Sequence, residues 1–199
     1  MSRFSQRGQD KMPLDVVSAE ILYENGQETY RNVKINDRST DQGLDAIAGS
    51  SSTGEFASTL LALFHPDTDA TFRSGGPSSI SGVSAQVYDF QVRNETSHWT
   101  LHAGSQSVTA AYSGSVWIDP KTARVLRIEM QARNLPSEFP MDWVESSVDY
   151  SYVTIDGMSF LLPTHAESLG CERGSKICSH NVIYFRNYHE FKVEIKIGD

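Results

Sequence analysis

One stretch near the middle of the chain, Ala111–Gln131, constrains the fold most strongly. Two runs rich in β-branched and aromatic residues flank Asp119-Pro120-Lys121-Thr122. Asp followed by Pro favours the first two positions of a type I turn. In the second run, Leu126, Ile128 and Met130 alternate with charged residues, as in a strand with one buried and one solvated face. The stretch therefore predicts a β-hairpin within a curved antiparallel sheet.

The register of this hairpin decides where Trp117 lies. Simple pairing across Pro120-Lys121 places Trp117 on the same face as Leu126, Ile128 and Met130. A one-residue bulge would move Trp117 to the opposite face of the sheet. The sequence leaves both registers open.

A second hairpin is predicted around Asn25-Gly26, because this dipeptide supplies the two positive φ angles of a type I′ turn. Pairing across it places Leu22 opposite Thr29 and Val16 opposite Ile35. The other face of the hairpin carries Ile21, Tyr23 and Tyr30. The hairpin is therefore apolar on both sides, and we expect each side to be covered.

Asp156-Gly157 predicts a third hairpin by the same reasoning. Pairing across it puts five apolar residues on one face: Val153, Ile155, Met158, Phe160 and Leu162. Pro163 follows, and because proline cannot donate to a β-ladder it marks an edge or a bulge.

Strand-like runs separated by turn residues continue to the end of the chain and predict an all-β meander. After residue 70 they are Ala70–Arg73, Ser84–Arg93, Ser97–Ala103, Val108–Ile118, Arg124–Arg133, Val144–Ile155, Met158–Ser168 and Val182–Ile197. Residues 1–12 are polar and are expected to form an arm or a first strand. In the last run, Phe191, Val193, Ile195 and Ile197 alternate with charged residues, which predicts a half-buried strand.

One or a few helices are predicted to cover the sheet: a short helical turn over Leu44–Ala48 and, after it, a helix over Gly54–His65 that Pro66 ends. Ser52 followed by Glu55 resembles a capping box at its start. Its apolar residues recur at helical spacing, and they are Phe56, Leu60, Leu63 and Phe64. A helix of about three turns is not stable alone, so we expect it to lie on the sheet.

The composition favours a soluble globular protein without a nucleic-acid partner. The 199 residues carry a net charge of −8, whereas nucleic-acid binders and proteins of anionic membrane surfaces concentrate Lys and Arg. No apolar run approaches the ~18–20 residues of a spanning helix, so the chain is not expected to span a membrane. Its oligomeric state is unknown from the sequence.

Cys171 and Cys178 enclose six residues between two predicted strands. We expect a disulfide, and free thiols in a cytosolic loop are the alternative. A disulfide indicates an oxidising compartment. The first residues are polar and contain no signal peptide. We therefore expect a periplasmic, cell-surface or secreted chain whose leader has been removed.

Enzyme chemistry has little support in the sequence. No Gly-x-Ser-x-Gly elbow, phosphate-binding loop, dinucleotide glycine fingerprint or His-Glu-x-x-His motif occurs. His98 and His102 would lie ~13 Å apart on one strand, too far to share a metal. Asp149 and Glu145 are expected on a solvated strand face. A carboxylate pair assembled from distant positions is the remaining catalytic alternative, but we expect no catalysis, metal or cofactor.

Two motifs resemble a known family. Val116-Trp-Ile-Asp-Pro120 with Arg124-Val-Leu-Arg-Ile-Glu129 resembles the central hairpin of the bacterial outer-membrane lipoprotein carrier superfamily, the LolA and LolB type. The runs Ser52–Phe64 and Phe160–Pro163 resemble a group of exported, uncharacterised bacterial proteins of that fold. The resemblance implies one domain over residues 1–199. It also implies an incomplete β-barrel of about eleven strands, plugged by helices, whose apolar cavity holds acyl chains.

The leading hypothesis is therefore non-catalytic binding of a hydrophobic molecule, such as a lipid or a lipoprotein acyl chain. A single short helix cannot cover a sheet of eight or more strands, so either a cavity or additional loops must cover the rest. The residues expected to line the concave face are Trp117, Leu126, Ile128, Met130, Phe160, Leu162, Phe56, Leu60 and Phe64. The alternative is a structural or protein-interaction domain of the envelope with a fully packed core.

Overall fold

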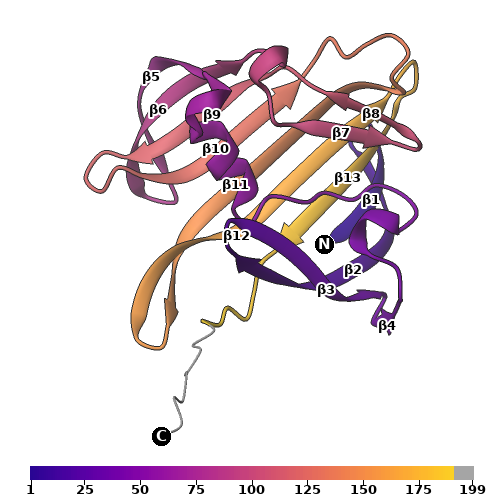
Figure 1. Ribbon diagram of the computed structural model, residues 1–199, viewed down its shortest axis with the longest axis horizontal. Coiled ribbons are helices and arrows are strands. Elements are labelled where there is room, and N and C mark those ends of the chain that lie inside the picture. Colours follow the sequence, from indigo (N-terminus) through magenta and orange to yellow (C-terminus); the bar gives the residue numbers. More distant parts are fainter. Residues whose placement is uncertain (191–199) are drawn as a thin grey trace, which may run out of the picture.

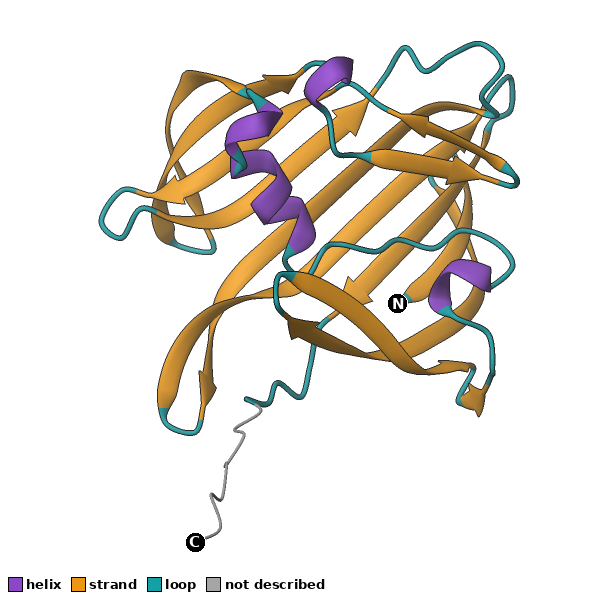
Figure 2. Cartoon of the chain, viewed as in Figure 1, coloured by secondary structure: helices purple, strands orange, loops and turns teal. Residues whose placement is uncertain are grey.

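The computed structural model describes residues 1–190. Most of them belong to one large antiparallel β-sheet that does not close into a barrel (Figure 1). Within these residues there is one α-helix, and it crosses one face of the sheet (Figure 2). The predicted class, a mainly β protein with a curved antiparallel sheet and a covering helix, is confirmed.

The elements follow the turn signals of the sequence. The strands are β1 (Ser2–Arg7), β2 (Asp10–Glu24), β3 (Gln27–Ile35), β4 (Arg38–Ser39), β5 (Thr71–Ile80), β6 (Val83–Val92), β7 (Thr100–Ala103), β8 (Gln106–Thr109), β9 (Tyr112–Asp119), β10 (Arg124–Ala132), β11 (Met141–Ile155), β12 (Met158–Glu172) and β13 (Ile177–Tyr184). The α-helix is α1 (Ser58–Phe64), and three short 3-10 helices are η1 (Leu44–Ala46), η2 (Pro66–Thr68) and η3 (Asn94–Thr96).

The sheet is not the simple meander that the sequence predicts. Across the described residues, eleven strands are ordered β4-β3-β2-β1-β13-β12-β11-β10-β9-β6-β5. β1 lies between β2 and β13, so residues 1–12 form a strand of the sheet and the start of β2 rather than an arm. β7 and β8 form a separate hairpin in front of the same face as α1 (Figure 1). The strand predicted over Val108–Ile118 is consequently divided between β8 and β9.

The core lies between α1 and one face of the sheet, which we call the inner face. Cross-strand pairs align Val116 of β9, Ile128 of β10, Val148 of β11 and Ala166 of β12 in one row of that face. All four are buried, and Leu63 of α1 packs in the same cluster. The opposite side is the outer face.

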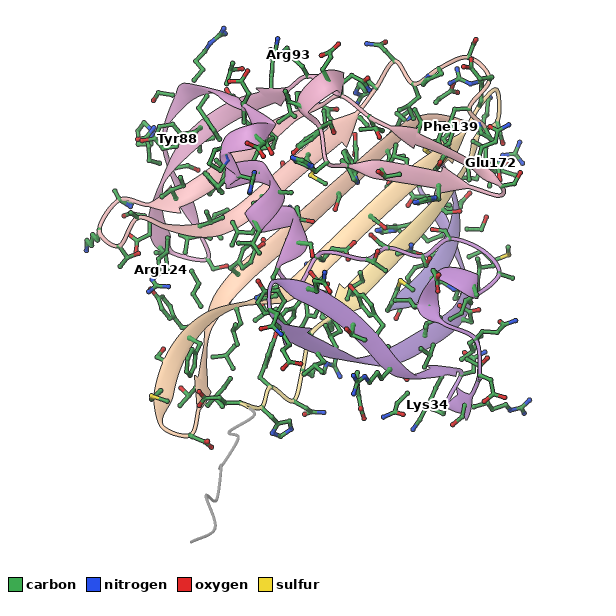
Figure 3. The ribbon with its side chains drawn as sticks, in the orientation of Figure 1. Lys34, Tyr88, Arg93, Arg124, Phe139 and Glu172 are labelled. Atoms are coloured by element: carbon green, nitrogen blue, oxygen red, sulfur yellow. A yellow bond between two sulfur atoms is a disulfide. The ribbon has the colours of Figure 1, made fainter. Side chains whose placement is uncertain are left out.

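Two smaller clusters complete the interior. Leu101 of β7, with Leu135 and Phe139 from the loop before β11, packs against the inner face at one end. Arg173 fixes this loop by donating hydrogen bonds to the Phe139, Leu135 and Met141 carbonyls. Figure 3 shows Phe139 beside Glu172, where β12 ends.

The third cluster lies at the other end of the sheet, on the β2–β3 hairpin. It consists of Val17 and Val33 from the strands, with Leu44 and Ile47 from the segment that follows β4. This segment therefore covers the inner side of the hairpin as expected, whereas on the outer side Leu14 and Val16 are more than half exposed, so the expected cover of that side is wrong.

Both two-residue turns form as predicted. Asn25, Gly26, Asp156 and Gly157 all have positive φ. Leu22 pairs with Thr29 as expected, but Ile35 pairs with Val17 rather than Val16. A bulge between these pairs shifts the register by one residue, and Asn32 adopts a φ of 51° there. An interior bulge carries no turn signature in the sequence.

The central hairpin also contains a bulge. Asp119 accepts hydrogen bonds from the Lys121 amide and the Thr122 hydroxyl, so the predicted turn residue does act in the turn. The ladder then shifts between Val125 and Arg127. Trp117 consequently pairs with Arg127 and lies on the outer face, and its predicted place beside Ile128 is wrong.

The hairpin between β12 and β13 carries the predicted disulfide. Cys171 and Cys178 are directly paired across the two strands, with their Cα atoms 4.0 Å apart, and are bonded. β13 ends at Tyr184, earlier than predicted. The alternating residues Phe191, Val193, Ile195 and Ile197, on which the longer strand was predicted, lie outside the described residues.

Candidate functional site

A cavity of about 540 Å³ lies on the inner face, beside the β2–β3 hairpin. Its walls come from four parts of the chain: Met1, strand β2 with Tyr30 of β3, the loop between β4 and α1, and the end of β13 with the segment that follows it. The apolar and aromatic lining residues are Val17, Ala19, Ile21, Tyr30, Leu44, Phe56, Ile183, Phe185 and Tyr188. The cavity is large enough for a small organic ligand.

Aromatic rings form one wall of this cavity. Phe56 lies at its centre, with ring centroids 6.1 Å from Tyr23, 6.0 Å from Phe185 and 6.5 Å from Tyr188. These rings come from β2, from the loop before α1 and from the segment after β13. Aromatic pairs at such separations stabilise one another beyond their buried area, so this wall holds three distant segments together.

One carboxyl group is buried at the polar side of the cavity. Glu55 is 4% exposed and lines the cavity together with Ser52. The Ser52 hydroxyl donates a hydrogen bond to Glu55 Oε1. This contact replaces the predicted capping box, because α1 begins only at Ser58 and its N-cap residue is Ala57. The predicted helix start at Gly54 is therefore wrong.

Glu28 of β3 provides the helix cap instead. Its Oε1 atom accepts hydrogen bonds from the Ala57 and Ser58 amides, each at 2.8 Å. Its Oε2 atom accepts one from the Tyr30 hydroxyl at 2.6 Å. The same hydroxyl accepts a hydrogen bond from the Gly54 amide at 3.0 Å. A strand residue therefore satisfies the helix donors that a local side chain usually satisfies.

The electrostatics of this region reflect two acids in a buried setting. Burial raises the pKa of Glu55, a backbone hydrogen bond lowers it and the nearby charge of Glu28 raises it, and together they bring this pKa to about 7. Burial likewise raises the pKa of Tyr30 and of Tyr150, and the charges of Glu28 and Glu55 contribute at Tyr150. Tyr150 is 6% exposed, and its hydroxyl has no partner among the described residues.

Charged residues also line the cavity where it is more exposed to solvent. Glu20 of β2, and Arg186 and His189 from the segment after β13, belong to its lining. The Arg186 guanidinium lies 5.4 Å from the centre of the Tyr184 ring. The cavity therefore has an apolar wall, a buried acidic side and a charged, exposed rim.

The structure brings together only part of the predicted site. Phe56 lines the cavity. Ile128, Met130 and Leu60 belong to the packed core beneath α1. Phe64 is 46% exposed and stacks on Phe72 at 5.8 Å.

The remaining predicted residues are displaced by bulges. Leu126 is the bulged residue of β10; it is buried but belongs to none of the three core clusters. A second bulge, where Tyr150 pairs with Pro163 and Asp149 with His165, shifts β12. Leu161 then packs on the core. Because successive strand residues alternate, Phe160 and Leu162 lie on the outer face.

Most residues that line the cavity were missed by the sequence reasoning. The signal that could have found them is the hairpin around Asn25-Gly26, which is apolar on both faces. Ile21 and Tyr30, paired across it, both line the cavity. The contributions of Ile183 and Phe185 have no such signal, because they depend on the pairing of β1 with β13.

The outer face carries a ribbon of alternating charges across four strands. Arg127 forms ion pairs with Glu129 and Asp149. His165 continues it, 3.1 Å from Asp149 and 3.6 Å from Glu167.

His180 ends this ribbon, with its Nε2 atom 2.8 Å from Glu167, and it is buried, at 4% exposure. A polar depression of about 480 Å³ borders the ribbon. Each carboxylate of the ribbon has a basic partner, so the charges are accounted for without a ligand.

Other site classes receive no support from residues 1–190. No three His, Cys, Asp or Glu side chains of this part are grouped to hold a metal ion. None of its helices is long and apolar enough to cross a membrane. No protein-family model, curated protein or solved structure matches the chain.

Proposed function

We propose that this protein binds a hydrophobic molecule, such as a lipid or an acyl chain, in the cavity beside the β2–β3 hairpin, without covalent chemistry. The observation that carries the proposal is the cavity itself, about 540 Å³ with a wall of aliphatic and aromatic side chains. Each methylene group transferred from water into such a site contributes about 0.8 kcal/mol to binding. The resemblance to lipoprotein carriers, which hold acyl chains in a half-barrel, points to the same ligand class.

The Cys171–Cys178 disulfide supports a compartment outside the reducing cytosol. We therefore place this binding activity in the periplasm, at the cell surface or in the secreted fraction. A carrier in such a compartment shields an apolar molecule from water during its transfer.

Filling the cavity tests the proposal. Ala19 lines the cavity, whereas Thr29, which pairs with Leu22, is exposed on the outer face of the same hairpin. We expect Ala19→Trp to weaken binding of a fluorescent fatty-acid or alkyl probe at least tenfold, and Thr29→Trp to leave it unchanged. Circular dichroism and thermal unfolding identify a variant that fails to fold. Equal probe affinity in folded Ala19→Trp, or no binding by the wild type, would contradict the proposal.

A protein-interaction domain is the second candidate, and one observation favours it. Leu61 and Phe64 of α1 and Phe72 of the edge strand β5 are all about half exposed. Phe64 and Phe72 stack with their planes 7° apart, so this apolar patch is preformed. If Phe64→Ser no longer bound a partner protein that the wild type binds, but bound an alkyl probe with unchanged affinity, this second function would be favoured.

A further inference from the structure

We infer that the ligand of the cavity is an amphipathic molecule whose polar end is a hydrogen-bond donor, a primary amine, that reaches Glu55. This inference rests on the proposed function and specifies its ligand class. It starts from an observation that the packing of the protein does not explain: a carboxyl group buried in the wall of an otherwise apolar cavity.

Helix capping does not explain the burial of Glu55, whose Oε1 atom accepts a hydrogen bond from the Ser52 hydroxyl. The cap of α1 is supplied by Glu28 rather than by Glu55. Among residues 1–190, the ion pairs found involve neither Glu55 nor Glu28. Glu55 thus accepts a hydrogen bond from Ser52 but has no ion-pair partner there, and a buried carboxyl group of this kind that lines a cavity is a candidate for contact with a ligand.

A second polar group lies close to Glu55. Tyr150 is more than nine-tenths buried, and its hydroxyl has no partner among the described residues. The charges of Glu28 and Glu55 both act on this hydroxyl, so it lies in the same polar region. Tyr30 and Ser52 add two further hydroxyl groups to the cavity wall. This region therefore holds a carboxyl group without an ion-pair partner and a buried hydroxyl group without a hydrogen-bond partner among the described residues.

The charge of this side selects the polar end of the ligand. The carboxylate of a fatty acid placed there would face Glu28 and Glu55, two groups of like charge. An ammonium group would instead offset one of the two negative charges and donate up to three hydrogen bonds. Glu28 already accepts hydrogen bonds from the helix amides and Tyr30. The ammonium group of the ligand therefore contacts Glu55.

The remaining charged groups around the cavity do not supply this interaction. Glu20 lines the cavity on β2, and Arg186 and His189 line it after β13. Met1 lines it as well, and its α-ammonium group donates a hydrogen bond to the Val17 carbonyl. Arg186 and His189 are exposed, and Arg186 lies over Tyr184. A ligand with an amine at its buried end can therefore leave its apolar body against Phe56 and Ile21.

Three probes with the same chain test the inference: dodecylamine, dodecanol and dodecanoate, each below its micellar concentration. Competition with a fluorescent alkyl probe at pH 8 measures their affinities for the wild type and for Glu55→Gln. We expect dodecylamine to bind the wild type at least tenfold more tightly than dodecanoate. In Glu55→Gln that preference should fall below threefold, with dodecanol affinity unchanged within threefold.

The pH dependence of the wild type gives a second test that needs no variant. Amine binding should weaken as the pH falls from 8 to 5.5, because Glu55 takes up a proton over this range, while dodecanol binding stays constant. Equal or tighter binding of dodecanoate, or an amine preference that survives in Glu55→Gln, would overturn the inference and leave the proposed function standing. Failure of all three probes to bind would overturn both.

Discussion

Glu55 shows how strongly burial can raise the pKa of one carboxyl group. The loop before α1 and strand β3 enclose this carboxyl group, and burial with the nearby Glu28 charge raises its pKa to about 7. An ordinary glutamate ionises near pH 4.5. The folded protein therefore holds a proton on Glu55 over a range in which the unfolded chain has lost it.

This difference makes stability depend on pH. Between about pH 4.5 and pH 7 the folded state binds more protons than the unfolded state, so the free energy of unfolding should fall by about 3 kcal/mol as the pH rises through this window. Above pH 7 it should level off. Urea unfolding at pH 4.5, 6 and 8 measures the change, and Glu55→Gln should lack it.

Two other carboxyl groups do not interfere with this test. The pKa values of Asp15 and Asp119 are lowered, by a hydrogen bond from Arg3 and by the backbone amide of Lys121. Their protonation therefore changes the free energy of unfolding only below pH 4. An identical pH profile for the wild type and Glu55→Gln would show that Glu55 is not proton-linked to folding.

At the scale of elements, helix α1 depends on a strand for its first turn. It has seven residues, too few to be stable in isolation. Leu63 fixes it to the core, and Glu28 of β3 accepts two of its N-terminal amides. The helix is consequently coupled to the β2–β3 hairpin, which borders the cavity.

Removing this cap should weaken both elements. We expect Glu28→Ala to lower the free energy of unfolding by about 2 kcal/mol, because two helix amides and the Tyr30 hydroxyl lose their acceptor. Hydrogen exchange should accelerate at the Ala57 and Ser58 amides. Glu24→Ala, on the exposed tip of the same hairpin, is the control, and a similar effect from it would contradict the capping role.

At the scale of the whole molecule, β1 joins the two ends of the described chain. It pairs with β2 on one side and with β13 on the other. Arg3 of β1 is buried and donates to Asp15 of β2 at 2.5 and 2.6 Å. It also donates to the Ala48 carbonyl at 2.7 Å and the Ser50 carbonyl at 3.3 Å. One side chain therefore attaches the loop that encloses the cavity to the centre of the sheet.

Loss of Arg3 should disturb the fold well beyond β1. We expect Arg3→Met to lower the free energy of unfolding by about 3 kcal/mol, since it leaves the Asp15 carboxylate and two loop carbonyl groups without their donor. Chemical denaturation provides the measurement. Arg7→Met, at an exposed position of the same strand, should cost less than about 1 kcal/mol. Equal losses of unfolding free energy from both substitutions would show that the Arg3 contacts stabilise the fold no more than those of an exposed arginine.

The sequence by itself determined the local features of this protein. Asn25-Gly26 and Asp156-Gly157 predict their turns because positive φ is a property of the residues themselves. Alternation along β10 and β11 predicts which residues of these strands are buried, because side chains on a strand alternate. The disulfide was predictable because Cys171 and Cys178 flank one short connection.

Only the tertiary structure decided which features meet at the cavity. Single-residue bulges place Trp117, Phe160 and Leu162 on the outer face; Pro163 marks the bulge of β12 in the sequence, but nothing local marks the bulge of β10. The cap of α1 comes from Glu28, about thirty residues earlier in the chain. The cavity wall forms because β1 pairs with both β2 and β13, which places the segment after β13 beside β2. These contacts depend on strand pairing over long sequence separations, whereas turns and alternation depend on neighbouring residues alone.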